Sequence, residues 1–255
     1  FIIEHVTMIV KTGGRHESLI KMCKSMWKYY PKLKSIIVDD FKENASFKFI
    51  LFLKNYSSYL TYIPTNQFTG ISRGRNIALS LVKTKYFLLL DDDYNFNSKT
   101  NLMTLASILE STDATIAGGE HRVGHDTICN YFGIFLTKHH NKITLFHING
   151  RVYEEIIGFK NCYRVDITKN FYIARTNVIL QNGGWNNDLQ YMEHEDFFLR
   201  LAYTKKKVVW CGDIRISHCQ KPDDLRRKRE SHAVYDQEKW ISFHNFTNYD
   251  WITDP

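Results

Sequence analysis

Residues 87–93 read Phe-Leu-Leu-Leu-Asp-Asp-Asp, an apolar run that ends in three consecutive carboxylates. The run from Tyr86 to Leu90 predicts a buried β-strand. Adjacent carboxylates at the end of such a strand repel one another unless a cation neutralises them. Because side chains alternate along an extended chain, Asp91 and Asp93 share one side and Asp92 takes the other. We therefore expect Asp93 to bind a metal ion and Asp91 to contact a metal or a ribose; the alternative is a solvated acidic turn.

Strands and helices alternate around this segment. An apolar, β-branched run predicts a strand over His5 to Lys11, followed by a turn at Thr12-Gly13-Gly14. The other predicted elements of this half are helix Arg15–Tyr30, strand Ser35–Val38 closed by Asp39-Asp40, a strand pair at Phe49–Leu53 and Tyr59–Ile63, helix Arg73–Val82 capped by Ser72, and helix Leu102–Leu109. This order is typical of an α/β fold with a doubly wound, mostly parallel sheet. Ligands of such sheets bind at the carboxyl ends of the strands, where the acidic residues lie.

The second half of the chain gives a more mixed pattern. Its predicted elements are strands Phe132–Leu136, Ile143–Ile148, Phe171–Ala174, Val208–Cys211 and Ile214–Ser217, with helices Val178–Asn182 and Glu195–Tyr203. We find neither an internal repeat nor a linker-like stretch, and the 255 residues include only 4 prolines and 13 glycines. We therefore expect a single domain over residues 1–255.

The formal net charge of +7 favours anionic partners, such as nucleic acid, an anionic membrane surface or phosphorylated small molecules. Two basic clusters, Lys205–Lys207 and Arg226–Arg229, are typical of solvated surfaces. The sequence has no basic stripe interleaved with aromatic residues, so we do not expect a nucleic acid partner. No apolar run approaches the roughly 18–20 residues that span a bilayer.

The sequence leaves the cellular compartment open. The chain begins in a strand-like segment, Phe1–Val10, rather than in a signal peptide, which suits a cytosolic protein. Sequons for N-glycosylation at Asn44, Asn55 and Asn245 favour instead a lumenal domain of a longer precursor. The cysteines allow two disulfides with one free thiol, or none, and their spacing does not decide the pairing; they are Cys23, Cys129, Cys162, Cys211 and Cys219.

Three further groups of residues are candidates for chemistry. Residues 193–196, Glu-His-Glu-Asp, open a predicted helix after a glycine-containing loop that could bring them to a cleft, although acidic side chains in a first turn also stabilise the helix dipole. His218 follows a predicted strand and becomes a ligand candidate if that strand returns beside Asp93. Residues 72–76, Ser-Arg-Gly-Arg-Asn, place arginines and free backbone amides at a helix start, which suits a phosphate group or simply caps the helix.

A second class of enzyme shares the acidic strand end. Phosphohydrolases can also begin their site with a strand that ends in Asp-x-Asp. Their chemistry usually requires Thr or Val shortly afterwards, whereas Tyr94 and Asn95 follow here. We therefore do not favour a phosphohydrolase.

Several short blocks of sequence follow one another over about residues 70–220. They are Gly74–Ser80 with Thr84–Tyr86, Asp91–Asp93, Gly158-Phe159 with Cys162 and Asp166, Asn170–Thr176, His194-Glu195 with Phe197–Leu199, then Cys211 and His218. In this order they resemble the GT-A glycosyltransferases, and more narrowly the animal beta-1,4-N-acetylgalactosaminyltransferases. The resemblance implies a GT-A (Rossmann-like) fold in which a smaller mixed sheet lies on the acceptor side. Residues 1–95 would form the nucleotide-binding half and residues 96–255 the acceptor-binding half.

The resemblance also implies how a UDP donor would be held. Asp93 would bind Mn²⁺ (or Mg²⁺), with Asp91 toward the ribose or the metal and His218 as a distant metal ligand. Arg75 would face the donor diphosphate. The remaining donor-binding positions would be Thr12, Arg15, Asp39 and Asp92.

The base is implied less sharply. In the wider inverting beta-1,4-transferases a Glu-Asp pair opens the corresponding helix, so Asp196, with Glu195 beside it, would take the proton of the acceptor hydroxyl. The narrower family has another acidic residue or a different spacing near this position, so the choice between the two stays open. Attack from the face opposite the leaving UDP would invert the anomeric centre through an oxocarbenium-like state.

The function implied by the resemblance is transfer of N-acetylgalactosamine from UDP to a hydroxyl of a glycan, glycolipid or glycoprotein. It further implies a stem and membrane anchor preceding these residues, hence a type II protein of the Golgi lumen or a secreted form, and allows a homodimer. The alternatives are transfer of another sugar, such as N-acetylglucosamine or galactose, and a catalytically silent relative that binds sugar or a partner protein. Acceptor recognition is expected in the irregular segments Glu120–Tyr131 and Gly150–Phe159.

Overall fold

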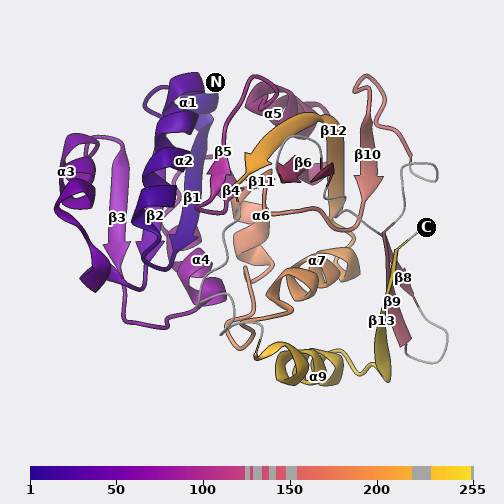
Figure 1. Cartoon of the computed structure of the whole chain (residues 1–255). Coiled ribbons are helices and arrows are strands. Elements are labelled where there is room, and N and C mark those ends of the chain that lie inside the picture. The colour runs from indigo at the N-terminus through magenta and orange to yellow at the C-terminus, as the bar shows by residue number, and fades with distance from the viewer. Residues whose placement is uncertain (124–126, 129–133, 138–141, 148–153, 220–230, 254–255) are drawn as a thin grey trace.

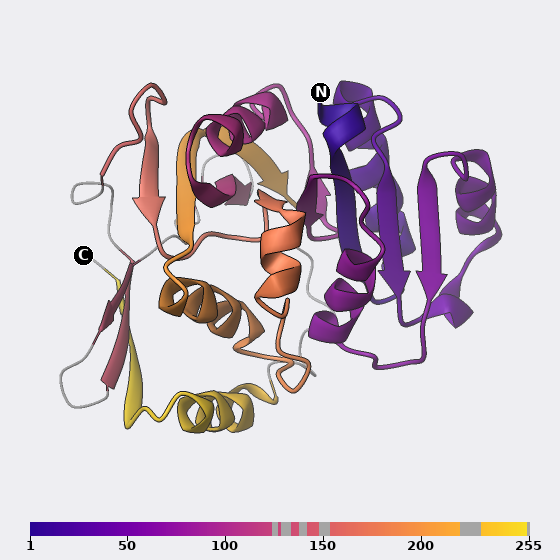
Figure 2. The same ribbon diagram turned by 180° about the vertical axis from the view of Figure 1, so that it is seen from behind.

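The computed structural model describes residues 1–123, 127–128, 134–137, 142–147, 154–219 and 231–253. A twisted sheet of ten strands runs through the molecule with helices on both faces, and a second sheet of three strands lies at one end (Figure 1). The same arrangement is seen from behind in Figure 2. Residues 124–126, 129–131 and 150–153 of the two predicted acceptor segments, which include Cys129, and the Arg226–Arg229 cluster lie outside the described residues.

The first half of the chain forms the parallel side of the large sheet. Its strands are β1 (Val6–Thr12), β2 (Ser35–Asp39), β3 (Leu60–Pro64) and β4 (Tyr86–Leu90), in the spatial order β4-β1-β2-β3. Neighbouring strands in this row are all parallel. The helices between them are α2 (His16–Tyr29), α3 (Phe47–Asn55) and α4 (Ile71–Ser80), after a short α1 (Ile2–His5). The predicted alternation of this half is therefore confirmed.

Three local predictions in this half are wrong. Residues 2–5 of the strand-like segment Phe1–Val10 form the short helix α1, and the strand begins only at Val6. Residues 49–53 belong to helix α3 and not to a strand, because Phe49 and Phe52 bury one helical face and Ser46 caps its start by accepting a hydrogen bond from the amide of Phe49. Ser72 does not cap α4, which begins after Gly70. Its hydroxyl is buried and donates to the carbonyl of Leu189, so it ties α4 to the second half.

The second half of the chain turns the sheet into a mixed one. Strand β11 (Tyr172–Arg175) pairs antiparallel with β4 and with β6 (Ala114–Val123), which no sequence pattern had indicated. Strand β12 (Lys207–His218) lies parallel to β6, and β10 (Cys162–Val165) closes the edge against β12. The two strands predicted at 208–211 and 214–217 are one strand, interrupted by a register shift between Cys211 and Arg215.

A small sheet and four helices complete the described chain. In the small sheet β8 (Ile134–Thr137) is antiparallel to β9 (Lys142–His147), and β13 (Asn248–Thr253) is parallel to β9, so the expected second mixed sheet is present. The remaining elements are helices α5 (Leu102–Ser111), α6 (Thr176–Gln181), α7 (Glu193–Tyr203) and α9 (Ala233–Phe243), a 3₁₀ turn η1 (Lys42–Asn44), and the short strands β5 (Tyr94–Asn95) and β7 (Thr127–Ile128).

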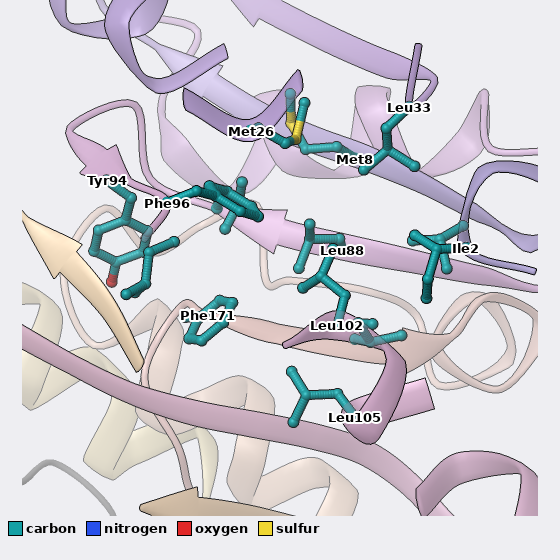
Figure 3. Close-up of a cluster of buried hydrophobic side chains, with 14 of the residues drawn as sticks. Ile2, Met8, Met26, Leu33, Leu88, Tyr94, Phe96, Leu102, Leu105 and Phe171 are labelled. Atoms are coloured by element: carbon teal, nitrogen blue, oxygen red, sulfur yellow. The ribbon is translucent and has the colours of Figure 1, made fainter. Parts of the chain in front are cut away.

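Side-chain alternation along the central strands builds a hydrophobic core on each face of the sheet. Met8 and Leu88 point to the side covered by α2, α3 and α5, where they pack with Leu102 and Phe171 (Figure 3). Ile9 of β1 and Phe87 and Leu89 of β4 point to the other side, which is covered by α4, α6, α7 and α9. The acidic strand ends are therefore mounted on a sheet that is packed on both faces.

Among the described residues no helix combines the length and apolar character that crossing a membrane requires. A disulfide joins Cys162 of β10 to Cys211 of β12. Cys23 is a buried free thiol and Cys219 an exposed one. The sequence left open whether the cysteines form two disulfides or none, and the described residues contain one disulfide.

We expect the Cys162→Ala/Cys211→Ala double variant to lose about 2–4 kcal/mol of unfolding free energy, because the bridge restricts the unfolded chain between positions 49 residues apart. Urea denaturation under non-reducing conditions measures the loss. Cys219→Ala, at an exposed thiol, serves as the control and should unfold at the wild-type midpoint. Equal midpoints for the double variant and the control would contradict a stabilising bridge.

Candidate active site

One pocket of about 460 Å³ opens at the carboxyl ends of β1, β2 and β4. Four of the donor- and metal-binding residues predicted from the sequence line it: Arg15, Asp91, Asp92 and Asp93. This is the edge at which a doubly wound sheet binds ligands. Loops that follow different strands therefore form this pocket around the acidic triplet.

The middle carboxylate of the triplet points into the protein. Asp92 is buried and accepts hydrogen bonds from the Thr12 hydroxyl at 2.6 Å and from Arg15 Nε at 3.2 Å, and Arg15 Nη2 makes a further ion pair with it. Burial raises the pKa of Asp92 to about 6, against the opposing charge of Arg15. Thr12 is itself buried and absent from the pocket wall, so it supports Asp92 and does not face a ligand.

The third carboxylate meets the predicted distant histidine. His218 Nε2 lies 3.2 Å from Asp93 Oδ1, and Arg15 Nη1 donates to Asp93 Oδ2 at 3.1 Å. Burial by itself would raise the pKa of Asp93, but the contact with His218 and the charge of Arg15 hold it below its ordinary value. Backbone pairing explains the approach, because β5, which follows Asp93 directly, pairs with the end of β12 and the Cys219 amide donates to the Asp93 carbonyl at 2.8 Å.

These side chains fit a divalent cation as a partial ligand set. Asp93 and His218 offer one oxygen and one nitrogen donor side by side. Asp93 and the partly exposed carboxylate of Asp91 line the pocket, whereas His218 lies behind Asp93 and does not. No group of three or more acidic, histidine or cysteine side chains in the described ranges is arranged as a complete metal site. An ion here would therefore need further ligands from a bound substrate, as Mg²⁺ and Mn²⁺ sites that hold phosphates commonly do.

Asp39 does not face the pocket, contrary to the expectation that it contacts the donor. It is fully buried, and its carboxylate binds His16 Nε2 at 2.6 Å and the Tyr62 hydroxyl at 2.8 Å. Its other oxygen accepts the amides of Gly14 and Phe41. Burial would raise the pKa of Asp39, but these hydrogen bonds hold it below the ordinary value. Asp39 thus fixes the loops after β1 and β2, which in turn shape the pocket.

Arg75 links the acidic triplet to the start of α7. Its guanidinium is 2% exposed and contacts Asp91 Oδ1 at 3.4 Å and Glu193 Oε1 at 3.3 Å. It also lies over the ring of Trp185, 5.6 Å from the ring centroid. Asn170 donates to Asp91 from the other side, at 3.2 Å. Arg75 is therefore a buried counter-ion behind the pocket wall, and not a side chain that projects into the pocket as the resemblance implied.

The structure places Glu195 and Asp196 away from the pocket. Helix α7 begins at Glu193, two residues before the predicted start, and Glu193 is the acidic residue of its first turn that lines the pocket. Glu195 lies about 200° further around the helix. Asp196 is buried with both oxygens engaged, by Arg200 Nε at 2.8 Å and by His244 Nε2 at 3.0 Å. Asp196 therefore joins α7 to α9.

Several pocket residues were not predicted as site residues. Phe41 and Phe68 meet edge to face at 5.2 Å between ring centroids, next to an ion pair in which Lys11 lies 2.7 Å from Asp40. Asn170, Gln190, Glu193 and His232 also line the pocket. The sequence did mark two of these positions, because Asp40 is the second acidic residue at the end of β2 and Asn170 is the first residue of the family-like block 170–176. Glu193 belonged to the acidic group at residues 193–196, in which the expected base was Glu195 or Asp196. Lys11 lies in β1, and the remaining pocket residues named here lie outside the helices and strands, where the sequence carries no pattern.

We expect Asp196→Asn to lower the unfolding free energy by about 1–3 kcal/mol, because it removes the charge that Arg200 and His244 bind inside the protein. Urea denaturation at neutral pH measures this change. Asp188→Asn, at an exposed carboxylate of the preceding loop, is the matched control and should be neutral. An Asp196→Asn protein as stable as the control would mean that these contacts contribute nothing.

Comparison with known families gives one match that spans most of the chain. Residues 8–177 match the model of Glycosyl transferase family 2. The matched region begins in β1 and ends after β11, so it contains the acidic triplet, Arg15, Arg75 and Asn170.

Comparison with individual proteins points to the same family. Beta-1,4 N-acetylgalactosaminyltransferase 2 of Mus musculus is 31% identical over 213 residues, which cover 84% of this chain and 39% of that protein. Beta-1,4 N-acetylgalactosaminyltransferase 1 of Homo sapiens is 29% identical over 220 residues, with 85% and 39% covered. The chain thus spans about two fifths of the length of these curated relatives.

Two solved structures share the fold. The crystal structure of GalNAc-T7 with UDP, GalNAc and Mn²⁺ superposes with a TM-score of 0.66 at 11% identity, covering 96% of this chain and 55% of that one. The structure of S. aureus TarS 1-349 in complex with UDP-GlcNAc gives a TM-score of 0.64 at 16% identity, covering 93% and 64%. Both are GT-A glycosyltransferases, which confirms the fold expected from the sequence.

Proposed function

Because this chain belongs to Glycosyl transferase family 2, we propose that it transfers a sugar from a UDP donor to a glycan hydroxyl. The observation that carries the proposal is the convergence of the acidic triplet, Arg15 and Glu193 on one pocket at the carboxyl ends of the parallel strands. Transfer from a sugar diphosphate needs positive charge at the phosphates and a carboxylate that takes the proton of the acceptor hydroxyl, and this pocket offers both kinds of group.

The order of the strands beneath the pocket supports an orientation for the donor. The edge-to-face pair of Phe41 and Phe68 offers an apolar surface suited to a flat nucleobase, and Lys11 with Asp40 offers polar groups beside it. In the sheet order β11-β4-β1-β2-β3, these two rings follow β3 and β2, whereas Arg15 follows β1 and the acidic triplet follows β4, where the ribose and diphosphate would lie. Asn170 precedes β11 on the far side of β4, and Glu193 is linked to Asp91 through Arg75, so the transferred sugar would meet the acceptor there.

The metal in this proposal would be held by Asp93 and His218, with Asp91 toward the ribose or the ion. When bound, a divalent cation such as Mn²⁺ supplies positive charge that offsets the charge building on the departing diphosphate. Arg15, which lines the pocket and touches both Asp92 and Asp93, supplies a second positive charge at the same place. Arg75 keeps Asp91 and Glu193 oriented from behind the wall.

Glu193 is our candidate for the base, in place of Glu195 or Asp196. It lines the pocket, and its contact with Arg75 fixes the carboxylate at the wall. A carboxylate on this side could take the proton of the acceptor hydroxyl as that oxygen attacks from the face opposite the leaving UDP, which would invert the anomeric centre.

The relatives support the identity of the transferred sugar, and the disulfide supports the cellular compartment. The named mammalian relatives support N-acetylgalactosamine as the transferred sugar, and UDP-GlcNAc in the TarS complex keeps N-acetylglucosamine as the alternative. The disulfide between Cys162 and Cys211 supports an oxidising compartment such as the Golgi lumen. The membrane anchor and the homodimer stay predictions of the sequence.

We expect UDP to bind at least about tenfold more tightly with Mn²⁺ than with EDTA, and Asp93→Ala to abolish that difference. Isothermal titration of UDP measures both affinities, and hydrolysis of UDP-N-acetylgalactosamine in the same buffers reports on the reaction. Asp113→Ala, at an exposed carboxylate far along the sheet, should behave as wild type. UDP binding that is indifferent to Mn²⁺ would contradict the metal assignment, and a wild-type protein that binds no UDP would contradict the proposed function.

We expect Glu193→Gln to lower turnover at least about a hundredfold while UDP affinity in Mn²⁺ stays within a few fold, because a base acts on the acceptor and not on the nucleotide. Steady-state transfer kinetics and UDP titration separate the two effects. Glu195→Gln is the matched control on the same helical turn and should keep most of its rate. An inactive Asp196→Asn protein that is fully folded, together with an active Glu193→Gln protein, would restore the assignment made from the sequence.

A further inference from the structure

Helix α9 carries aromatic side chains on its outer surface. Tyr235, Lys239 and Phe243 follow one another at four-residue spacing, which places them in one row along the helix. Tyr235 is 63% exposed and Phe243 is 46% exposed. The Lys239 ammonium lies between them, 5.9 Å from the centroid of Tyr235 and 5.6 Å from that of Phe243. We call this row the aromatic face of α9.

Hydrogen bonds fix helix α9 to the loop that leads into α7. On the inner side of α9, the Asp236 carboxylate accepts the amides of Gln190 and Tyr191, at 2.9 and 2.7 Å, and Trp240 is fully buried. On the face itself, Lys239 donates to the Asp188 carbonyl at 3.0 Å. The contacts of Asp236 and Lys239 join α9 to the loop that leads into α7. Figures 1 and 2 both show the first turn of α9 beside that loop.

The aromatic face continues outward from the pocket. Gln190, on the loop that α9 holds, lines the pocket, and so does His232, which is the residue just before α9. Tyr235 follows His232 by less than one helical turn. Glu193, where the proposed function places the attacking acceptor hydroxyl, follows Gln190 by three residues and lines the same pocket. An acceptor bound there would therefore extend over the Gln190 and His232 side.

The chemistry of the aromatic face suits a saccharide. Exposed aromatic rings present flat apolar surfaces, which pack well against the C–H face of a pyranose, and tyrosine does so at a low cost in conformational entropy. Lys239 is already oriented by Asp188 and has further N–H groups for sugar hydroxyls or a sugar carboxylate. We propose that the aromatic face of α9 binds the acceptor oligosaccharide, with pyranose rings stacked on Tyr235 and Phe243. This inference rests on the proposed function.

The test compares glycan binding by three proteins on an array of neutral and carboxylate-bearing oligosaccharides, in the presence of UDP and Mn²⁺. The proteins are wild type, Tyr235→Ala/Phe243→Ala, and the control Tyr29→Ala. Tyr29 is a matched control because it is 40% exposed on α2 and also has a lysine, Lys28, over its ring at 5.7 Å. Titration of each protein with UDP and Mn²⁺, and its thermal unfolding, are measured in parallel.

We expect wild type and Tyr29→Ala to retain the same glycans, and the double variant to lose at least about tenfold in signal with unchanged UDP affinity and unfolding temperature. A double variant that binds glycans like wild type overturns the inference, as does a wild-type protein that retains no glycan. Both of these results leave the proposed function standing if UDP still binds. Absence of UDP binding by wild type instead rejects the proposed function itself.

Discussion

The repulsion among three adjacent carboxylates at the end of β4 is the constraint on which the site depends. Each carboxylate is met by groups from distant parts of the chain: Asp92 by Thr12 and Arg15, Asp91 by Arg75 and Asn170, and Asp93 by Arg15 and His218. Without these partners, burial of the triplet would be unfavourable by several kcal/mol. The acidic strand end therefore requires the loop after β1, the helix α4, the segment before β11 and the end of β12 to meet at one place.

Local sequence patterns were sufficient where local physics decides the structure. The apolar run before Asp91 predicted β4, and the acidic residues at the ends of β2 and β4 predicted the edge of the sheet at which the pocket lies. His218 could be named as a partner of Asp93 only on the condition that its strand returned there, and the pairing of β5 with β12 meets that condition. The resemblance in blocks over residues 70–220 added the fold, which the structural comparisons bear out.

The predicted site residues that do not line the pocket share a physical explanation, because side-chain direction depends on contacts that a single sequence does not display. The start of α7 decides which acidic residue faces the pocket, and a shift of two residues exchanges Glu195 for Glu193. Asp39 is acidic and lies at a strand end, but His16 and Tyr62 take its carboxylate inside the protein. Arg75 has the charge that suits a phosphate, yet its guanidinium is enclosed by Asp91, Glu193 and Trp185.

The register shift in β12 limits how this part of the chain can diverge among relatives. Residues 212–214 have no partner on β6, and we call them the excursion. The pairing then resumes with Arg215 opposite Glu120, and His218 lies opposite Val123 of β6 and Tyr94 of β5. Loss or gain of one residue after the excursion would turn every following side chain to the other face of the sheet, so that the imidazole would leave Asp93. Insertions are therefore tolerable within the excursion but not in the four residues that follow it, where sequence change is confined to substitution.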